Sequence, residues 1–107
     1  MSYHVEYHSD AEKDRDALNL SVRTQVERAI SKVAENPLPK NEGGYGTPLG
    51  NKHGRNLTGL CKIKLLKLGI RVVYKVVQEG ETMRIIVIAV RADDEVYKMA
   101  AKRIGQQ

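Results

Sequence analysis

Residues 60–77 read LCKIKLLKLGIRVVYKVV, and the alternation of apolar and polar side chains in this stretch decides the fold. Successive side chains on a β-strand point to opposite faces, so the pattern predicts two strands joined by a short turn at residues 67–69. If Leu65 pairs with Ile70 across that turn, the apolar rows of the two strands merge on one face. The same register places Lys64 directly opposite Arg71 on the other face.

Positive charge is concentrated on this second face. Like charges opposite each other destabilise a sheet, so a fold that gathers Lys62, Lys64 and Arg71 indicates an anion as ligand. The net charge is +5, and residues 60–107 hold ten basic and five acidic side chains, against eight of each in residues 1–59. Two interpretations stay open at this point: a surface for phosphates or an acidic partner, and a solvated surface without a ligand.

The composition predicts a single domain, residues 1–107, with a modest core. The chain has no Phe and no Trp, so the core is expected to be aliphatic, with Tyr74 among its apolar neighbours. No apolar run approaches the roughly 20 residues of a membrane helix, and the first residues lack a signal-peptide pattern. Cys61 is the single cysteine and falls on the apolar face. A reduced, cytoplasmic protein without membrane association is therefore expected.

Further elements surround the central hairpin. Residues 2–8 alternate as a strand, and Ser9 with Glu12 forms a capping box that predicts a helix over residues 10–19. A second helix is expected from Ser21 to the Asn36-Pro37 pair. Residues 37–59 are rich in Gly and Pro and are expected to form a long loop. The apolar stripe of the second helix consists of Val22, Val26, Ala29, Ile30 and Val33.

The last strand and the last helix complete the expected fold. Residues 82–90 are almost continuously apolar, as in a strand buried on both faces, and residues 95–104 predict a short helix after Asp93 or Asp94. The fold class is α+β with the order βααβββα: a helical hairpin packed on one face of a four-stranded, mainly antiparallel sheet, then a short C-terminal helix. We expect Met83, Ile85, Val87 and Ala89 on the core face, and Ile86, Ile88 and Val90 on the basic face.

Several short motifs follow one another along the second half of the chain. They are Lys62-Ile-Lys64-Leu, Gly69-Ile-Arg71-Val-Val-Tyr74, Arg91, Glu95-Val96-Tyr97 and Ala101-Lys102-Arg103-Ile104. In order and spacing they resemble the RelE/ParE family of bacterial toxins, and within it the RelE branch. The resemblance extends over nearly the whole chain and is most specific between residues 61 and 104.

The resemblance implies a toxin of a type II toxin–antitoxin system that cuts messenger RNA in the ribosomal A site. In RelE toxins the 2′-hydroxyl of one nucleotide attacks the adjacent phosphate, and no metal or other cofactor is implied. Lys64 would act as general base and Arg91 as general acid. Lys62 and Arg71 would hold the phosphate, and Tyr97 would orient the substrate or stack on it.

The implied partners are a cognate, RelB-like antitoxin with an acidic segment, the ribosome and its messenger RNA. Operator DNA would be bound only through the antitoxin complex. Val73, Ile86, Ile88 and Val90 are expected to be exposed beside the lysines and arginines. An acidic, amphipathic segment that folds on binding would fit such a basic, partly apolar surface.

Alternatives remain open at the level of the protein and of single residues. The chain is also compatible with a ParE-like inhibitor of DNA gyrase, or with a degenerate toxin that binds only antitoxin and operator. Lys62 and Lys64 also fit simple polar alternation, Arg71 and Arg91 also fit ion pairs, and Tyr97 also fits packing. The histidines are weighed as acid–base groups: His53, in the basic loop, is the nearest candidate, whereas His4 and His8 are expected on the surface.

Overall fold

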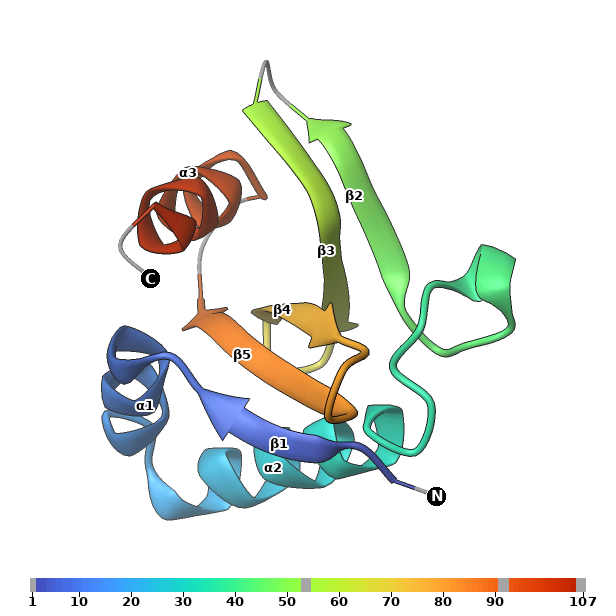
Figure 1. Ribbon diagram of the computed structural model, residues 1–107. Helices are drawn as coiled ribbons and strands as arrows, with labels where there is room; N and C mark the ends of the chain where they lie inside the picture. Colours follow the sequence, from blue (N-terminus) through green and yellow to red (C-terminus); the bar gives the residue numbers. More distant parts are fainter. Residues whose placement is uncertain (1, 53–54, 91–92, 106–107) are drawn as a thin grey trace.

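The structure is a computed structural model that describes residues 2–52, 55–90 and 93–105. Five strands form one sheet in the order β1-β5-β4-β3-β2, in which β1 runs parallel to β5 and the other neighbours are antiparallel (Figure 1). Within the described ranges, no helix has the length and apolar character that crossing a membrane requires. The elements are β1 (His4–Tyr7), α1 (Ser9–Asp16), α2 (Leu20–Val33), a 3-10 turn (Lys40–Glu42), β2 (Thr47–Lys52), β3 (Arg55–Leu65), β4 (Ile70–Val77), β5 (Thr82–Ala89) and α3 (Asp93–Ile104).

The α+β class and the helical hairpin are confirmed, but the sheet has a fifth strand. The stretch expected to be a long loop contains β2, which pairs antiparallel with a β3 that begins before the expected hairpin strand. Pro48 fits this place because β2 is an edge strand, where a residue without an N–H costs no ladder bond on the outer side. The high Gly and Pro content concealed the strand in the sequence.

Side chains fix where the first two helices begin, although not as the capping box predicted. The N-cap of α1 is His8, whose Nδ1 accepts a hydrogen bond from the Asp10 N–H at 3.1 Å. Ser9 lies inside the helix, so its assignment as N-cap was wrong. Asn19 caps α2 by accepting a bond from the Val22 N–H at 3.0 Å. Both caps satisfy backbone donors that the helix itself leaves unpaired.

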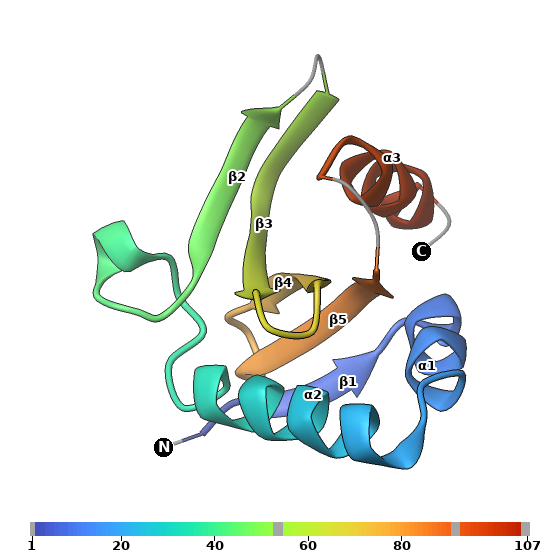
Figure 2. The same ribbon diagram turned by 180° about the vertical axis from the view of Figure 1, so that it is seen from behind.

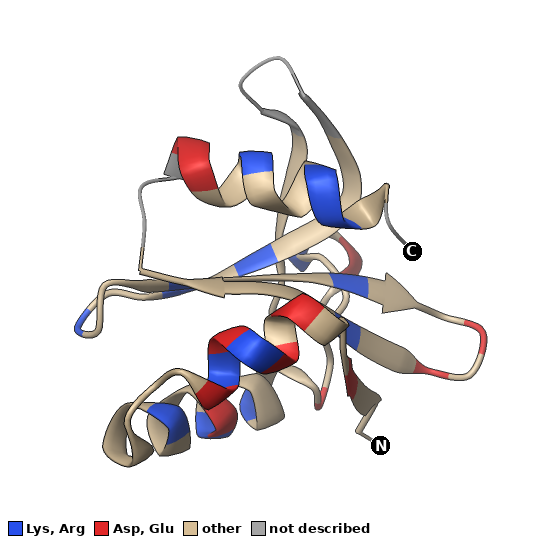
Figure 3. Ribbon diagram, turned by 90° about the vertical axis from the view of Figure 1, so that its left-hand side faces the viewer, with Lys and Arg blue, Asp and Glu red and all other residues tan. Residues whose placement is uncertain are grey.

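The sheet lies between two helical layers, as Figure 3 shows edge-on. On one face, α2 packs its stripe of Val26, Ile30 and Val33 into the larger core cluster, and Figure 2 shows this helix running across the sheet. On the other face, α3 packs in a second cluster with residues of β3, β4 and β5. The helices therefore cover both faces, whereas the sequence assigned only the N-terminal helical hairpin to a face of the sheet.

A β-bulge in β5 changes which side chains reach each face. Tyr74 pairs with Ile85 and Val73 with Val87, so Ile86 is an additional residue in β5. A bulge reverses the alternation beyond it. The predictions for the strand before the bulge were right: Met83 and Ile85 lie in the α1/α2 core, and Ile86 lies on the opposite face. Those beyond the bulge were wrong: Val87 and Ala89 face α3, and Ile88 faces α1 and α2.

Candidate anion-binding site

The basic hairpin of β3 and β4 has the register that the sequence predicted. Leu65 pairs with Ile70, and Lys64 lies directly opposite Arg71. On its other side Arg71 pairs with Ala89 of β5, so the arginine lies within the sheet and not at its rim. Lys64 is exposed, and Arg71 is partly buried. Two cations are thus held as neighbours by backbone pairing, an arrangement that an anion between them would stabilise.

Lys62 is fixed by Tyr97 of α3. Its Nζ donates a hydrogen bond to the Tyr97 hydroxyl at 2.9 Å and lies 5.6 Å from the centre of the ring. Tyr97 itself is only 2% exposed and belongs to the core cluster beneath α3. The tyrosine is therefore both a packing residue and the hydrogen-bond partner of a site cation. The ring attracts the ammonium, and the hydroxyl sets its position.

The remaining candidates divide between described and undescribed parts of the chain. Arg91 and His53 lie outside the described residues, so their expected roles remain predictions. His4 is exposed, as expected, whereas His8 is partly buried and caps α1.

The sequence did not indicate that Asp14 and Arg103 meet at the edge of β5. Arg103 Nη1 donates to Asp14 Oδ2 at 2.7 Å and to the Ile86 carbonyl at 2.8 Å. The same Asp14 oxygen accepts a bond from the Ile88 N–H at 3.1 Å. The available signal was the position of Arg103, which continues the apolar stripe of Val96 and Ala100 at helical spacing.

The opposite face of the hairpin is a conventional core. Tyr74 is fully buried, as expected, and its hydroxyl donates to the Pro37 carbonyl at 2.7 Å. Burial raises the pKa of the Tyr74 hydroxyl well above its ordinary value of 10.0. Burial likewise raises the pKa of the Cys61 thiol, which is 2% exposed on the expected apolar face. Both groups stay neutral and serve packing.

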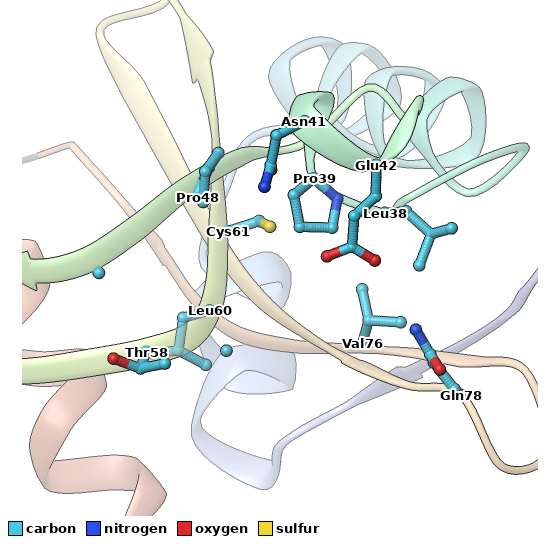
Figure 4. Close-up of a pocket in the computed structure, with 12 residues that line it drawn as sticks. Leu38, Pro39, Asn41, Glu42, Pro48, Thr58, Leu60, Cys61, Val76 and Gln78 are labelled. Atoms are coloured by element: carbon cyan, nitrogen blue, oxygen red, sulfur yellow. The ribbon is translucent and has the colours of Figure 1, made fainter.

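A cavity of about 400 Å³ lies away from the basic cluster, between the 3-10 turn, the β2–β3 ladder and the end of β4 (Figure 4). Among the lining residues that the structure describes, Glu42 is the one charged residue, and the other polar side chains include Asn41, Thr58 and Gln78. A carboxylate with no cation among these described residues does not suit a phosphate. The basic hairpin is therefore a better candidate for an anion than this cavity.

The exposed apolar surface that the sequence predicted beside the lysines is largely absent. Val73 and Ile86 are fully buried because α3 covers them. Ile88 is 3% exposed and faces the other core because of the bulge. Val90, at 64% exposed, is the one residue of the four that stands out into solvent.

The fold and the cation cluster define a small, basic α+β protein with a cationic hairpin and a helix that supplies a tyrosine to it. No protein-family model matches the chain. A curated relative, the mRNA interferase toxin RelE of Escherichia coli strain K12, is 32% identical over 97% of this chain and 99% of its own length. The chain therefore belongs to the RelE family of toxins.

Solved structures agree with this assignment. A doubly substituted variant of E. coli toxin RelE in the free state superposes with a TM-score of 0.76 at 30% identity, covering 97% of this chain and 99% of that one. The same variant in complex with a peptide of the antitoxin RelB gives a TM-score of 0.70 at 29% identity, covering 96% and 98%.

Proposed function

We propose that this protein is the toxin of a type II toxin–antitoxin system that cuts messenger RNA in the ribosomal A site. The observation that carries the proposal is the pairing of Lys64 with Arg71 beside Lys62 on one face of β3 and β4. Membership of the RelE family supports the same reaction, since the curated relative is named an mRNA interferase. A protein that works on ribosomes would act in the cytoplasm.

The proposed reaction is an in-line phosphoryl transfer within the RNA. The 2′-oxygen bonds to the adjacent phosphorus while the bond from phosphorus to the 5′-oxygen breaks. Lys64, as a neutral amine, takes the proton of the 2′-hydroxyl, and Arg91 supplies a proton to the departing 5′-oxygen. The products are a 2′,3′-cyclic phosphate upstream and a 5′-hydroxyl downstream.

In this scheme, cationic side chains bind the phosphate and stabilise the reacting charge. Lys62 and Arg71 hold the phosphate and stabilise the charge that accumulates on its oxygens, as preorganised donors do in other phosphoryl-transfer sites. The bond from Lys62 to Tyr97 and the burial of the ring favour an orienting role for Tyr97 over stacking on a base. The ribosome would supply the alignment of the codon, which the open, sheet-based site lacks.

A cognate antitoxin with an acidic segment is the proposed regulator. The solved complex of RelE with a RelB peptide supports a partner of this kind. The basic residues of β3 and β4 would attract the carboxylates of the antitoxin. Helix α3 occupies the apolar surface that we expected the antitoxin to cover. Contact with operator DNA would come through the antitoxin.

The identity of the nucleophile tests the proposal. The codon in the A site of a programmed ribosome is synthesised with a 2′-deoxy nucleotide at the position 5′ to the cut, and the purified protein is added. Cleavage should be abolished because the attacking group is missing, while binding to the ribosome stays the same. A deoxy substitution one codon away serves as the matched control and should leave cleavage intact.

Two results would count against the proposal. Efficient cutting of the deoxy codon would mean that water or a protein group attacks the phosphorus. Loss of cleavage on chelation, with ribosomal magnesium held constant, would mean that a metal takes part. Identical products with and without chelator, ending in a 2′,3′-cyclic phosphate, would support the metal-free reaction.

A further inference from the structure

The sheet-facing stripe of α3 ends in a charged residue. Val96, Ala100 and Arg103 follow one another at spacings of four and three residues, so they share one side of the helix. Val96 and Ala100 are fully buried, and the Arg103 side chain is 13% exposed. An apolar residue would complete this stripe without desolvating a charge, so the arginine calls for an explanation beyond packing.

Arg103 reaches round the edge of the sheet to the other helical layer. Its guanidinium bonds both oxygens of Asp14, at 2.7 and 3.4 Å, and its Nε lies 3.8 Å from Asp10 Oδ2. It also donates to the carbonyl of Ile86, the additional residue of the β5 bulge. Asp14 in turn accepts the Ile88 N–H. One ion pair thus ties α1, β5 and α3 together.

The place of this pair on β5 explains its geometry. The ladder between β1 and β5 ends at the pair of Tyr7 with Ile85, so the β5 backbone beyond it has no strand on that side. Asp14 and Arg103 supply the acceptor and donor that a continued β1 would have given. Arginine suits this task because its planar fork fixes several donors in one geometry.

A partly buried ion pair is a poor way to gain stability. Desolvation cancels much of the attraction, and well-packed apolar residues commonly stabilise as well or better. The pair does define a single position for the end of α3 relative to β5. Tyr97 lies six residues before Arg103, about 9 Å along the helix axis at the usual rise. A small rotation or shift of the helix would therefore move the Tyr97 hydroxyl from Lys62.

We propose that Asp14 and Arg103 are positioning residues of the active site: they lock α3 so that Tyr97 holds Lys62 where the phosphate binds. The inference rests on the proposed RNA cleavage for its catalytic consequence. Its structural part, the dependence of the bond between Lys62 and Tyr97 on the ion pair, stands independently of the reaction.

The test compares Asp14→Asn with Asp16→Asn. Both replace an aspartate of α1 by its isosteric amide and remove one negative charge, but Asp16 pairs with Arg15 and not with α3. Arg103→Gln and Lys102→Gln form a second matched pair on α3. Each variant is checked by circular dichroism and thermal melting, and those that fold as the parent does are carried forward.

Two readouts separate positioning from folding. Hydrogen exchange should become faster in the α3 amides of Asp14→Asn and Arg103→Gln, with α2 unchanged, and the Tyr97 ring resonance should shift in tyrosine-labelled protein. In single-turnover assays on programmed ribosomes, cleavage should slow roughly 10- to 100-fold, the size expected for small misplacements, while ribosome affinity stays within about twofold. The Asp16 and Lys102 variants should match the parent in both.

The outcomes keep the two proposals apart. The positioning role is overturned if the Tyr97 resonance and the α3 exchange rates stay parental in both Asp14→Asn and Arg103→Gln. It is also overturned if they change while cleavage stays at the parental rate. If the parent itself does not cut RNA, the proposed function fails, and the resonance and exchange data still decide whether the ion pair sets Tyr97. Should Arg103→Gln fail to fold, the isosteric Asp14→Asn carries the test alone.

Discussion

The two faces of the sheet are built from the same strands but differ in the side chains that they carry. The face under α1 and α2 is apolar throughout, with Cys61, Val72, Tyr74 and Ile85 among its buried residues. The face under α3 mixes buried residues such as Val73 with the cations Lys62, Lys64 and Arg71. Both faces bury apolar side chains and so contribute to the free energy of folding, but the second face also holds like charges together, which costs stability.

The difference shows how one hairpin can serve both purposes. Backbone pairing depends little on which side chains it carries, so strong packing on one face holds the register while the other face bears like charges. Helix α3 then covers the apolar part of the second face and contacts Lys62 through Tyr97. Experiments that alter one face at a time can test this division.

The largest expected effect belongs to the apolar face. Ile30 on α2 is 1% exposed, so Ile30→Ala should lower the free energy of unfolding by about 2–5 kcal/mol because it leaves a cavity. Urea denaturation measures the change, and Ser31→Ala, at an exposed neighbour, is the control. Unchanged stability would mean that α2 contributes little to the fold and that the comparison of faces is mistaken.

Arg71→Ala should show the reverse pattern. Loss of a donor that stabilises the reacting phosphate is expected to slow cleavage about 10²- to 10³-fold, with stability changed by less than about 1 kcal/mol. Single-turnover cleavage on programmed ribosomes, with a melt of the same sample, measures both. Lys75→Ala removes a charge from the same strand and face and should cut nearly as the parent does. An early melt of Arg71→Ala would make the arginine structural.

The smallest effect concerns alkaline pH and sharpens the contrast between the faces. The pKa of the Tyr74 hydroxyl and of the Cys61 thiol is raised by burial above 10.0 and 9.0 respectively, so the folded state keeps both groups neutral. The unfolded chain ionises them first, and stability present below about pH 9 should fall as pH rises further, by up to about 1.4 kcal/mol per pH unit for each group.

Chemical denaturation at pH 8 and at pH 10.5 measures this loss of stability. Tyr74→Phe should flatten the decline, whereas Tyr45→Phe, at a ring that is 49% exposed, should leave it as in the parent. Equal slopes for the two variants would show that Tyr74 ionises as easily in the folded protein as in the unfolded chain.

The local pattern of the sequence predicted the parts of the fold that rest on strict alternation. Residues 60–77 alternate polar and apolar side chains, and the register of Lys64 with Arg71 followed from it. In residues 82–90 only Thr82 and Arg84 are polar, and both precede the bulge, so no polar residue marked the faces beyond it and nothing revealed the bulge at Ile86. The burial of Val73 was missed because the sequence did not show which face α3 covers.

The grouping of the basic residues was predicted from register and charge, whereas the roles that the family resemblance implies for them remain predictions. The cluster of Lys62, Lys64 and Arg71 lies within one hairpin and was therefore visible locally. The contact of Asp14 with Arg103 joins residues 89 positions apart, and each residue taken alone resembles an ordinary surface charge. Such a pair becomes evident only when the tertiary structure brings the ends of α1 and α3 to one edge of β5.

The parallel pairing of β1 with β5 also fixes the order in which the molecule can assemble during synthesis. Val5 pairs with Met83, so the first strand waits for most of the chain before it finds its neighbour. Tyr97 and Arg103 are synthesised later still, and only then can α3 pack on the basic hairpin. A nascent chain therefore carries its lysines well before the helix that orients one of them, and the ribosome that makes this protein has moved past residue 103 before the hairpin is complete.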